Sequence, residues 1–373
     1  MNHEYIDQAD RLAEVVEKLK AVPLVGVDTE AAGYHRYLDR MSLIQLSSRE
    51  ENFLVDPLAI DDLSSLASLC EDPGIEKIFH DADYDLRILH RDAGVSVRGL
   101  FDTQIAAAFL GERSLGLGNI AEKYLGLKLP KAFQRADWAE RPLSDGMKEY
   151  AVTDTAHLPD LRDRLKEALE EKRRLEWARE EFLLREDTRW TESDDERERF
   201  MRVKGARDLA PRGLAILREL HAWREEVGEE RDQATFRVLS NQALLEMSAR
   251  PPQGARELRE ISGVSDGLAQ RRGGAILAAV SRGLAVPEDE LPRYPQARRW
   301  DRDPDHDARV EALKTARNRR ADELELEAGF LISRAMLEEI ARQRPQTPEA
   351  LAGVPGVRSW QVEALGAELL RVI

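Results

Sequence analysis

The first half of the chain carries apolar side chains in two alternating patterns. Short apolar runs bounded by turn residues predict strands over residues 24–30, 42–47, 52–56 and 75–79. Apolar positions three and four residues apart predict helices over residues 8–20, 63–70, 80–89, 101–110 and 144–169. Asp102 and Ser144 are predicted to cap the last two of these helices. Strands mixed with helices indicate an α/β domain, and the first three strands favour an antiparallel edge.

The second half is helical and contains a repeat. A charged helix is predicted to continue over residues 155–187, and a polar linker follows it. Beyond the linker, a shift of 93 residues superposes apolar, proline and glycine positions, and it places Arg224 on Arg317. Two copies of one small all-α domain explain this repeat. The predicted α/β domain, linker and two helical domains cover residues 1–187, 188–208, 209–290 and 291–373.

Composition and charge narrow the class of protein. A chain of 373 residues suits two or three domains, and its formal charge of −15 provides no general attraction for a polyanion. The single cysteine, Cys70, excludes an internal disulfide and a cysteine zinc site. No apolar run reaches membrane-spanning length, and the first residues lack a secretory pattern. We therefore expect a cytoplasmic protein with no membrane and no disulfide partner.

Two carboxylates lie at the end of the first predicted strand. Asp28 and Glu30 are two residues apart, so both project from the same side of a strand. Their like charges repel, and a divalent cation relieves the repulsion because carboxylate oxygens suit Mg²⁺ and Mn²⁺. Taken alone, such a pair after a strand is more often part of a turn or a helix cap than a metal site.

Two further acids occupy positions that can face a cleft. Asp85 lies in the first turn of the helix after the fourth strand, and Leu86 stands where a calcium loop requires glycine. Asp154 shares the apolar face of predicted helix 144–169 with Tyr150. A carboxylate buried there without a partner would cost roughly several kcal/mol, which favours a metal ligand. The alternative is that both side chains meet solvent at the boundary of the helix.

Residues 131–143 carry polar and basic side chains with little apolar periodicity. Gln134 and Arg135 make this segment a candidate surface for a phosphate chain. An ordinary loop anchored by Trp138 explains the pattern equally well.

Five motifs of the first half occur in a characteristic order and spacing, at residues 27–30, 80–86, 101–103, 134–143 and 150–154. Together they resemble the ribonuclease D family, within the DEDD superfamily of 3′-to-5′ exonucleases. Tyr150, four residues before Asp154, is typical of the tyrosine subclass. The first helical repeat resembles the HRDC domain through residues 220–225 and 258–263, whereas the second copy has Ala316 in place of Trp223.

The resemblance implies a fold, a reaction and a set of roles. The implied fold is an α/β ribonuclease H-like exonuclease domain followed by two small all-α HRDC-like domains. The implied reaction is phosphodiester hydrolysis by two-metal-ion catalysis, which releases nucleoside 5′-monophosphates from a 3′-hydroxyl end. Asp28 would bridge two divalent ions, Mg²⁺ or Mn²⁺, and Asp85 would hold the second. Glu30 and Asp154 would complete the first, and Tyr150 would orient the attacking water.

The implied partner is RNA, expected to be tRNA precursors and other structured RNA, and the implied state is a monomer. HRDC domains generally bind nucleic acid, and the basic runs at residues 271–272, 298–300 and 314–320 are candidate phosphate contacts or ordinary solvated faces. A DNA exonuclease of the same chemistry is an alternative function, because no residue of the sequence indicates recognition of the 2′-hydroxyl that distinguishes RNA from DNA. An inactive nucleic-acid-binding scaffold is the other alternative, which the presence of all four acids and Tyr150 disfavours.

Overall fold

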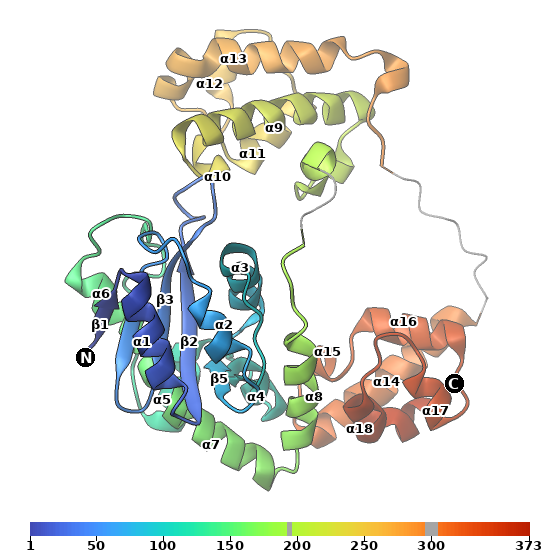
Figure 1. Ribbon diagram of the computed structural model, residues 1–373. Coiled ribbons are helices and arrows are strands. Elements are labelled where there is room, and N and C mark those ends of the chain that lie inside the picture. The colour runs from blue at the N-terminus through green and yellow to red at the C-terminus, as the bar shows by residue number, and fades with distance from the viewer. Residues whose placement is uncertain (192–195, 295–304) are drawn as a thin grey trace.

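The computed structural model describes residues 1–191, 196–294 and 305–373, which form one α/β unit and two helical units (Figure 1). The α/β unit is built on a six-stranded mixed sheet, with β2 antiparallel to β3 and parallel to β5. The predicted antiparallel set is present, and a short first strand extends it in parallel with β4. In spatial order the strands are β1 (Glu4–Ile6), β4 (Asn52–Val55), β3 (Met41–Ser47), β2 (Leu24–Ala31), β5 (Glu76–Phe79) and β6 (Leu100–Asp102).

Helices cover both faces of the sheet. They are α1 (Ala9–Leu19), α2 (Ser65–Cys70), α3 (Asp83–Ala93), α4 (Thr103–Phe109), α5 (Leu117–Leu125), α6 (Asp145–Ala156), α7 (Leu158–Glu171) and α8 (Leu175–Arg185). The predicted caps are confirmed, because Asp102 accepts hydrogen bonds from the first amides of α4 and Ser144 accepts one from Met147 in α6. No described helix has the length and apolar content needed to cross a membrane.

The prediction of one continuous helix over residues 144–169 is wrong. The helix is broken at His157 into α6 and α7, because Pro159 has no N–H with which to continue the hydrogen-bonded ladder and suits the first turn of a new helix. The predicted helix 155–187 is broken a second time, at Arg173, whose φ of 58° turns the chain before α8.

The two helical units repeat one order of helices. The first contains η1 (Glu196–Arg202), η2 (Ala206–Asp208), α9 (Pro211–Arg231), α10 (Thr235–Val238), α11 (Asn241–Ala249), α12 (Ala255–Glu260), α13 (Asp266–Ala285) and η3 (Glu288–Glu290). The second contains α14 (His306–Leu324), α15 (Ala328–Leu331), α16 (Arg334–Gln343), α17 (Pro348–Ala352) and α18 (Ser359–Leu370). Buried Arg224 and Arg317 hold equivalent places, since each donates to a carbonyl 15 residues further on, Leu239 and Ile332, at 3.2 Å.

Residues assigned to the linker contribute to the first helical unit. Phe200, Val203 and Ala206 belong to the buried core around α9, so the chain from Phe200 onward packs with this unit. Of the three basic runs, residues 271–272 lie on α13 and residues 314–320 on α14, whereas residues 298–300 lie outside the described residues.

The two helical units join the α/β unit in different ways (Figure 1). The second unit shares a continuous core with it, in which the ring of Trp360 lies 4.9 Å from that of Phe109 and its indole N–H donates to Glu181 at 2.7 Å. The first unit has a separate core and contacts the loop between β2 and β3 through α10, where the Ala234 amide donates to the His35 carbonyl at 3.0 Å.

Gly26 of β2 allows the α6–α7 junction to approach the sheet closely. A Cβ there would lie 2.9 Å from the Thr155 carbonyl oxygen and 3.2 Å from the Leu158 Cβ. We expect Gly26→Ala to lower the thermal unfolding midpoint and to cost about 1–3 kcal/mol, because backbone must shift to admit the methyl group.

Gly118→Ala is the matched control, since a Cβ at Gly118 in α5 meets nothing within 4 Å. Alanine there should leave stability unchanged or raise it by at most about 0.5–1 kcal/mol, because alanine loses less conformational freedom than glycine when the chain folds. Equal unfolding midpoints for the two variants would contradict the close approach at Gly26.

Candidate active site

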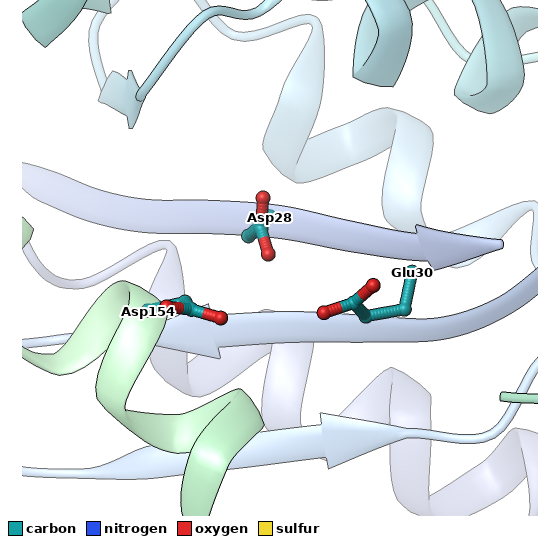
Figure 2. Close-up of side chains that lie close together, drawn as sticks. All are labelled: Asp28, Glu30 and Asp154. Carbon is teal, nitrogen blue, oxygen red and sulfur yellow. The ribbon is translucent and has the colours of Figure 1, made fainter. Parts of the chain in front are cut away.

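Three carboxylates from two elements come together on one face of the sheet. Side chains of β2 alternate between faces, so Asp28 and Glu30 share the face that α6 covers, and Asp154 reaches it from α6. Each of the three offers an oxygen, and these oxygens all lie within 4.8 Å of one another. Figure 2 shows the carboxylates of Glu30 and Asp154 turned toward each other with Asp28 between them.

Burial and mutual repulsion make these acids hard to ionise. Burial, followed by the charge of Asp154, raises the pKa of Asp28, and burial together with the neighbouring carboxylates raises that of Glu30. Burial raises the pKa of Asp154 to about 7, although a hydrogen bond from Tyr150 opposes the rise. No cationic side chain contributes to any of these shifts, so the negative charge of the ionised cluster has no counterion within the described chain.

Asp85 lies beside this cluster rather than within it. Its Oδ1 accepts hydrogen bonds from the Thr29 amide, at 3.0 Å, and from the Thr29 hydroxyl. Burial, followed by the charge of Asp28, raises the pKa of Asp85 well above its usual range. Asp102 helps to place it, because its carboxylate accepts hydrogen bonds from the amides of Asp81 and Ala82 just before α3.

Tyr150 lies one turn before Asp154 on α6 and is only 6% exposed. Its ring centroid lies 6.1 Å from the ring centroids of both Phe133 and Trp138. Burial, followed by the charges of Asp154 and Glu30, raises the pKa of the phenol. The hydroxyl is therefore protonated at neutral pH and can donate a hydrogen bond.

Gln45 belongs to the site although the sequence analysis did not single it out. It lies opposite Asp28 in the antiparallel register of β2 and β3, and its Nε2 donates to Asp28 Oδ2 at 3.3 Å. The side chain is fully buried, and its Oε1 has no hydrogen-bond partner in the described chain. An amide among the apolar residues of positions 43–46 was the available signal, but only the strand register shows which residue it faces.

The segment 131–143 was interpreted either as a surface for a phosphate chain or as a loop anchored by Trp138, and it has features of both. Trp138 is 1% exposed and anchors the segment in a small core with Tyr150. Gln134 and Arg135 are exposed on its surface. The anchoring is therefore confirmed, and contact of these two side chains with a phosphate chain stays a prediction.

The donor set fits a divalent metal ion. Hard cations such as Mg²⁺ and Mn²⁺ prefer carboxylate oxygens, and the three converging carboxylates offer such oxygens within 4.8 Å of one another. Bringing three anions together out of water is unfavourable unless a cation or bound protons compensate them. Among the described side chains this is the one group of at least three acids, histidines or cysteines close enough to hold an ion.

Comparison with family models places the fold in a known class. Residues 3–170 match the model described as 3′-5′ exonuclease, and residues 213–280 and 306–373 each match the HRDC domain. The fold prediction is thus confirmed. The chain is a 3′-to-5′ exonuclease with two HRDC domains.

Relatives of the whole chain narrow this class. Ribonuclease D of Gluconacetobacter diazotrophicus is 32% identical over 98% of this chain and 91% of that protein. Ribonuclease D of Escherichia coli K12 is 31% identical over 95% of this chain and 96% of its own length. The crystal structure of Escherichia coli RNase D, described as an exoribonuclease involved in structured RNA processing, has a TM-score of 0.72, 29% identity, and coverage of 100% of this chain and 98% of that one. The chain belongs to the ribonuclease D family and is a hydrolase, an exoribonuclease.

We expect the metal-free protein to lose stability as pH rises. The pKa of Asp154 is about 7 and that of Asp28 is raised, whereas carboxyls of an unfolded chain titrate near about 4. At intermediate pH the folded state therefore holds protons that the unfolded chain has released, and stability falls as these protons are removed. Thermal unfolding midpoints in EDTA, from about pH 5.5 to about pH 8.5, measure this decline.

Excess Mn²⁺ should abolish the decline, because a cation replaces the protons and binds more tightly as pH rises. The double variant Asp28→Asn, Asp154→Asn is the control, since it lacks both raised carboxyls. If the midpoint of the wild type in EDTA varies with pH no more than that of the double variant, the site does not titrate as described.

Proposed function

We propose that this protein trims the 3′ ends of structured RNA, such as tRNA precursors, by hydrolysis that depends on two divalent metal ions, Mg²⁺ or Mn²⁺. The observation that carries the proposal is the convergence of Asp28, Glu30 and Asp154 beside Tyr150, without a counterion from the described chain. Membership of the ribonuclease D family supports RNA as the substrate. We further propose that the protein acts as a monomer.

Four acids would hold the ions. Asp28, Glu30 and Asp154 offer converging oxygens, and Asp85, whose Oδ1 accepts the Thr29 hydrogen bonds, would serve from beside them. When bound, divalent ions lower the pKa of water and compensate the charge that develops on the phosphate. Gln45 would keep the Asp28 carboxylate oriented, since it donates to Oδ2 from the neighbouring strand.

Tyr150 would position the attacking water rather than deprotonate it. A phenol whose pKa is raised by burial and by neighbouring carboxylates is a poor base at neutral pH. Its contacts with Phe133 and Trp138 restrict the ring, so the hydroxyl presents a hydrogen bond from a defined place next to Asp154. Gln134 and Arg135, exposed on the adjoining segment, would contact the phosphates of the incoming strand.

We expect Asp28→Asn to abolish metal-dependent release of nucleoside 5′-monophosphates from RNA with a 3′-hydroxyl. Losing a shared ligand should reduce the rate by more than the roughly 10–100-fold that loss of an outer-shell partner costs. The measurement follows mononucleotide release with Mg²⁺, with Mn²⁺ and with EDTA. Undiminished release by this variant would remove Asp28 from the mechanism.

The same assay distinguishes RNA from DNA and an enzyme from a scaffold. A single-stranded DNA of identical sequence should be degraded more slowly than the RNA, and equal rates would favour a DNA exonuclease of the same chemistry. Binding without release of mononucleotides in either metal would favour an inactive scaffold.

Tyr150→Phe should lower kcat about 10- to 100-fold and leave KM nearly unchanged, because it removes the hydroxyl that places the water but keeps the packed ring. Tyr124→Phe is the control, since Tyr124 donates to Glu112 at 2.8 Å on a distant part of the unit. Steady-state kinetics on one RNA measure both constants. An unchanged kcat in Tyr150→Phe would show that its hydroxyl has no part in the reaction.

A further inference from the structure

An exposed aromatic pair lies where the first helical unit meets the exonuclease unit. Four aromatic side chains of the described residues are more than a third exposed, namely Tyr34, Tyr84, Trp190 and Phe236. Two of them are in contact, because the ring centroids of Tyr34 and Phe236 lie 5.4 Å apart with their planes tilted by 52°. Tyr34 is in the loop between β2 and β3 and is 40% exposed, and Phe236 is on α10 and is 47% exposed.

Two guanidinium groups accompany the pair. Arg237 lies 4.8 Å and Arg135 5.7 Å from the centroid of the Tyr34 ring. Both arginines are exposed, and neither has a carboxylate within ion-pair distance in the described chain. The protein has a net charge of −15, so two arginines without anionic partners in the described chain make the surface beside these rings locally positive. Aromatic faces and guanidinium groups together are the features that hold single-stranded nucleic acid.

The ring contact is not the only link between the two units. Hydrogen bonds to main-chain carbonyls also join them, from the Ala234 amide to His35 and from the Arg237 Nε to Tyr34 at 2.8 Å. The Tyr37 amide adds a bond to Asp232 at 3.2 Å. Tyr34 and Phe236 stay 40% and 47% exposed although these bonds join the units.

The chain segments that carry Tyr34 and Arg135 both lead from residues of the active site. Tyr34 follows Glu30 by four residues, which places their Cα atoms within about 14 Å of each other. Arg135 follows Phe133, whose ring packs on Tyr150, by two residues. The His35 ring joins the two segments through a 2.8 Å hydrogen bond with the Arg135 carbonyl.

We propose that Tyr34 and Phe236, flanked by Arg135 and Arg237, form a stacking surface for bases of the single-stranded 3′ segment of the RNA, upstream of the bond that is cut. This inference rests on the proposed function, because it assigns a path to the same substrate. Each unit supplies one ring and one guanidinium. The first helical unit thus takes part in binding the strand that enters the active site, and it does so without base specificity, since every base has a face to stack.

A protein–RNA mutant cycle tests this directly. In full-length protein carrying Asp28→Asn, which binds without cutting, we would measure affinity by fluorescence anisotropy for RNA oligonucleotides with one abasic nucleotide at successive positions. An abasic nucleotide at the stacked position should weaken binding about ten-fold, whereas other positions should matter little. Phe236→Leu and Tyr34→Leu should each weaken binding of intact RNA by a similar factor.

The decisive result is the coupling between the two changes. In Phe236→Leu the loss of affinity caused by the abasic nucleotide should disappear, because the protein no longer has the ring on which the base stacks. The control is Leu284→Ala, which changes an exposed apolar side chain on α13 of the same unit and should leave this loss of affinity intact. The same penalty at every position in the Asp28→Asn parent and in Phe236→Leu on that background would overturn the stacking surface. Thermal midpoints equal to that of the parent exclude unfolding as the cause of weaker binding.

Cleavage by the unsubstituted enzyme separates this inference from the proposed function. Metal-dependent trimming of RNA together with an unchanged abasic penalty in Phe236→Leu would reject the stacking surface alone. Absence of trimming would reject the proposed function, whatever the binding experiment shows. With the active enzyme, Tyr34→Leu and Phe236→Leu should raise KM about ten-fold and leave kcat almost unchanged, because the rings lie away from the reacting atoms.

Discussion

Repulsion among partly buried carboxylates is the constraint on which this structure depends. Asp28, Glu30 and Asp154 bring oxygens within 4.8 Å of one another, and no cation of the described chain offsets their charge. Only a rigid scaffold can hold such groups together, and β2 and α6 provide it. The strand fixes two of the acids through its alternation of faces. The helix, capped by Ser144 and admitted close to the sheet by Gly26, brings the third.

The groups around the cluster are polar but arranged so that they do not neutralise it. Gln45 contacts Asp28, Thr29 contacts Asp85, and Tyr150 contacts Asp154, each as a hydrogen-bond donor without a full charge. Donors of this kind orient a carboxylate and leave its charge available to a cation. A lysine or arginine in any of these places would form an ion pair with the carboxylate and neutralise the charge that attracts a metal ion.

The helical units differ in how firmly they are joined to the exonuclease unit. The second shares its core, with Trp360 packed on Phe109, so the two form one folded body. This tryptophan stands where the first copy has Gly267, which shows how duplicated domains diverge at the surface that each buries. The first unit keeps its own core and meets the loop that leaves β2, only a few residues beyond Glu30. Its position is therefore tied to the strand that carries two of the acids.

Local chemistry made much of this protein predictable from its sequence. Apolar periodicity located β2, β3, β4, β5 and most helices, but not the three-residue strands β1 and β6. Side-chain oxygen chemistry located the caps at Asp102 and Ser144, and the 93-residue repeat located the paired domains. The helix break at His157 was missed because apolar spacing continued through Pro159, although that proline was the available signal.

What only the tertiary structure decided concerns residues far apart in the chain. It placed Asp85 beside the cluster rather than in it, set Gln45 against Asp28, and brought Tyr34 into contact with Phe236, 202 residues further along the chain. A sequence states which side chains are present and which face of an element they share. Distances between elements depend on strand register and close packing, and these are properties of the folded chain as a whole.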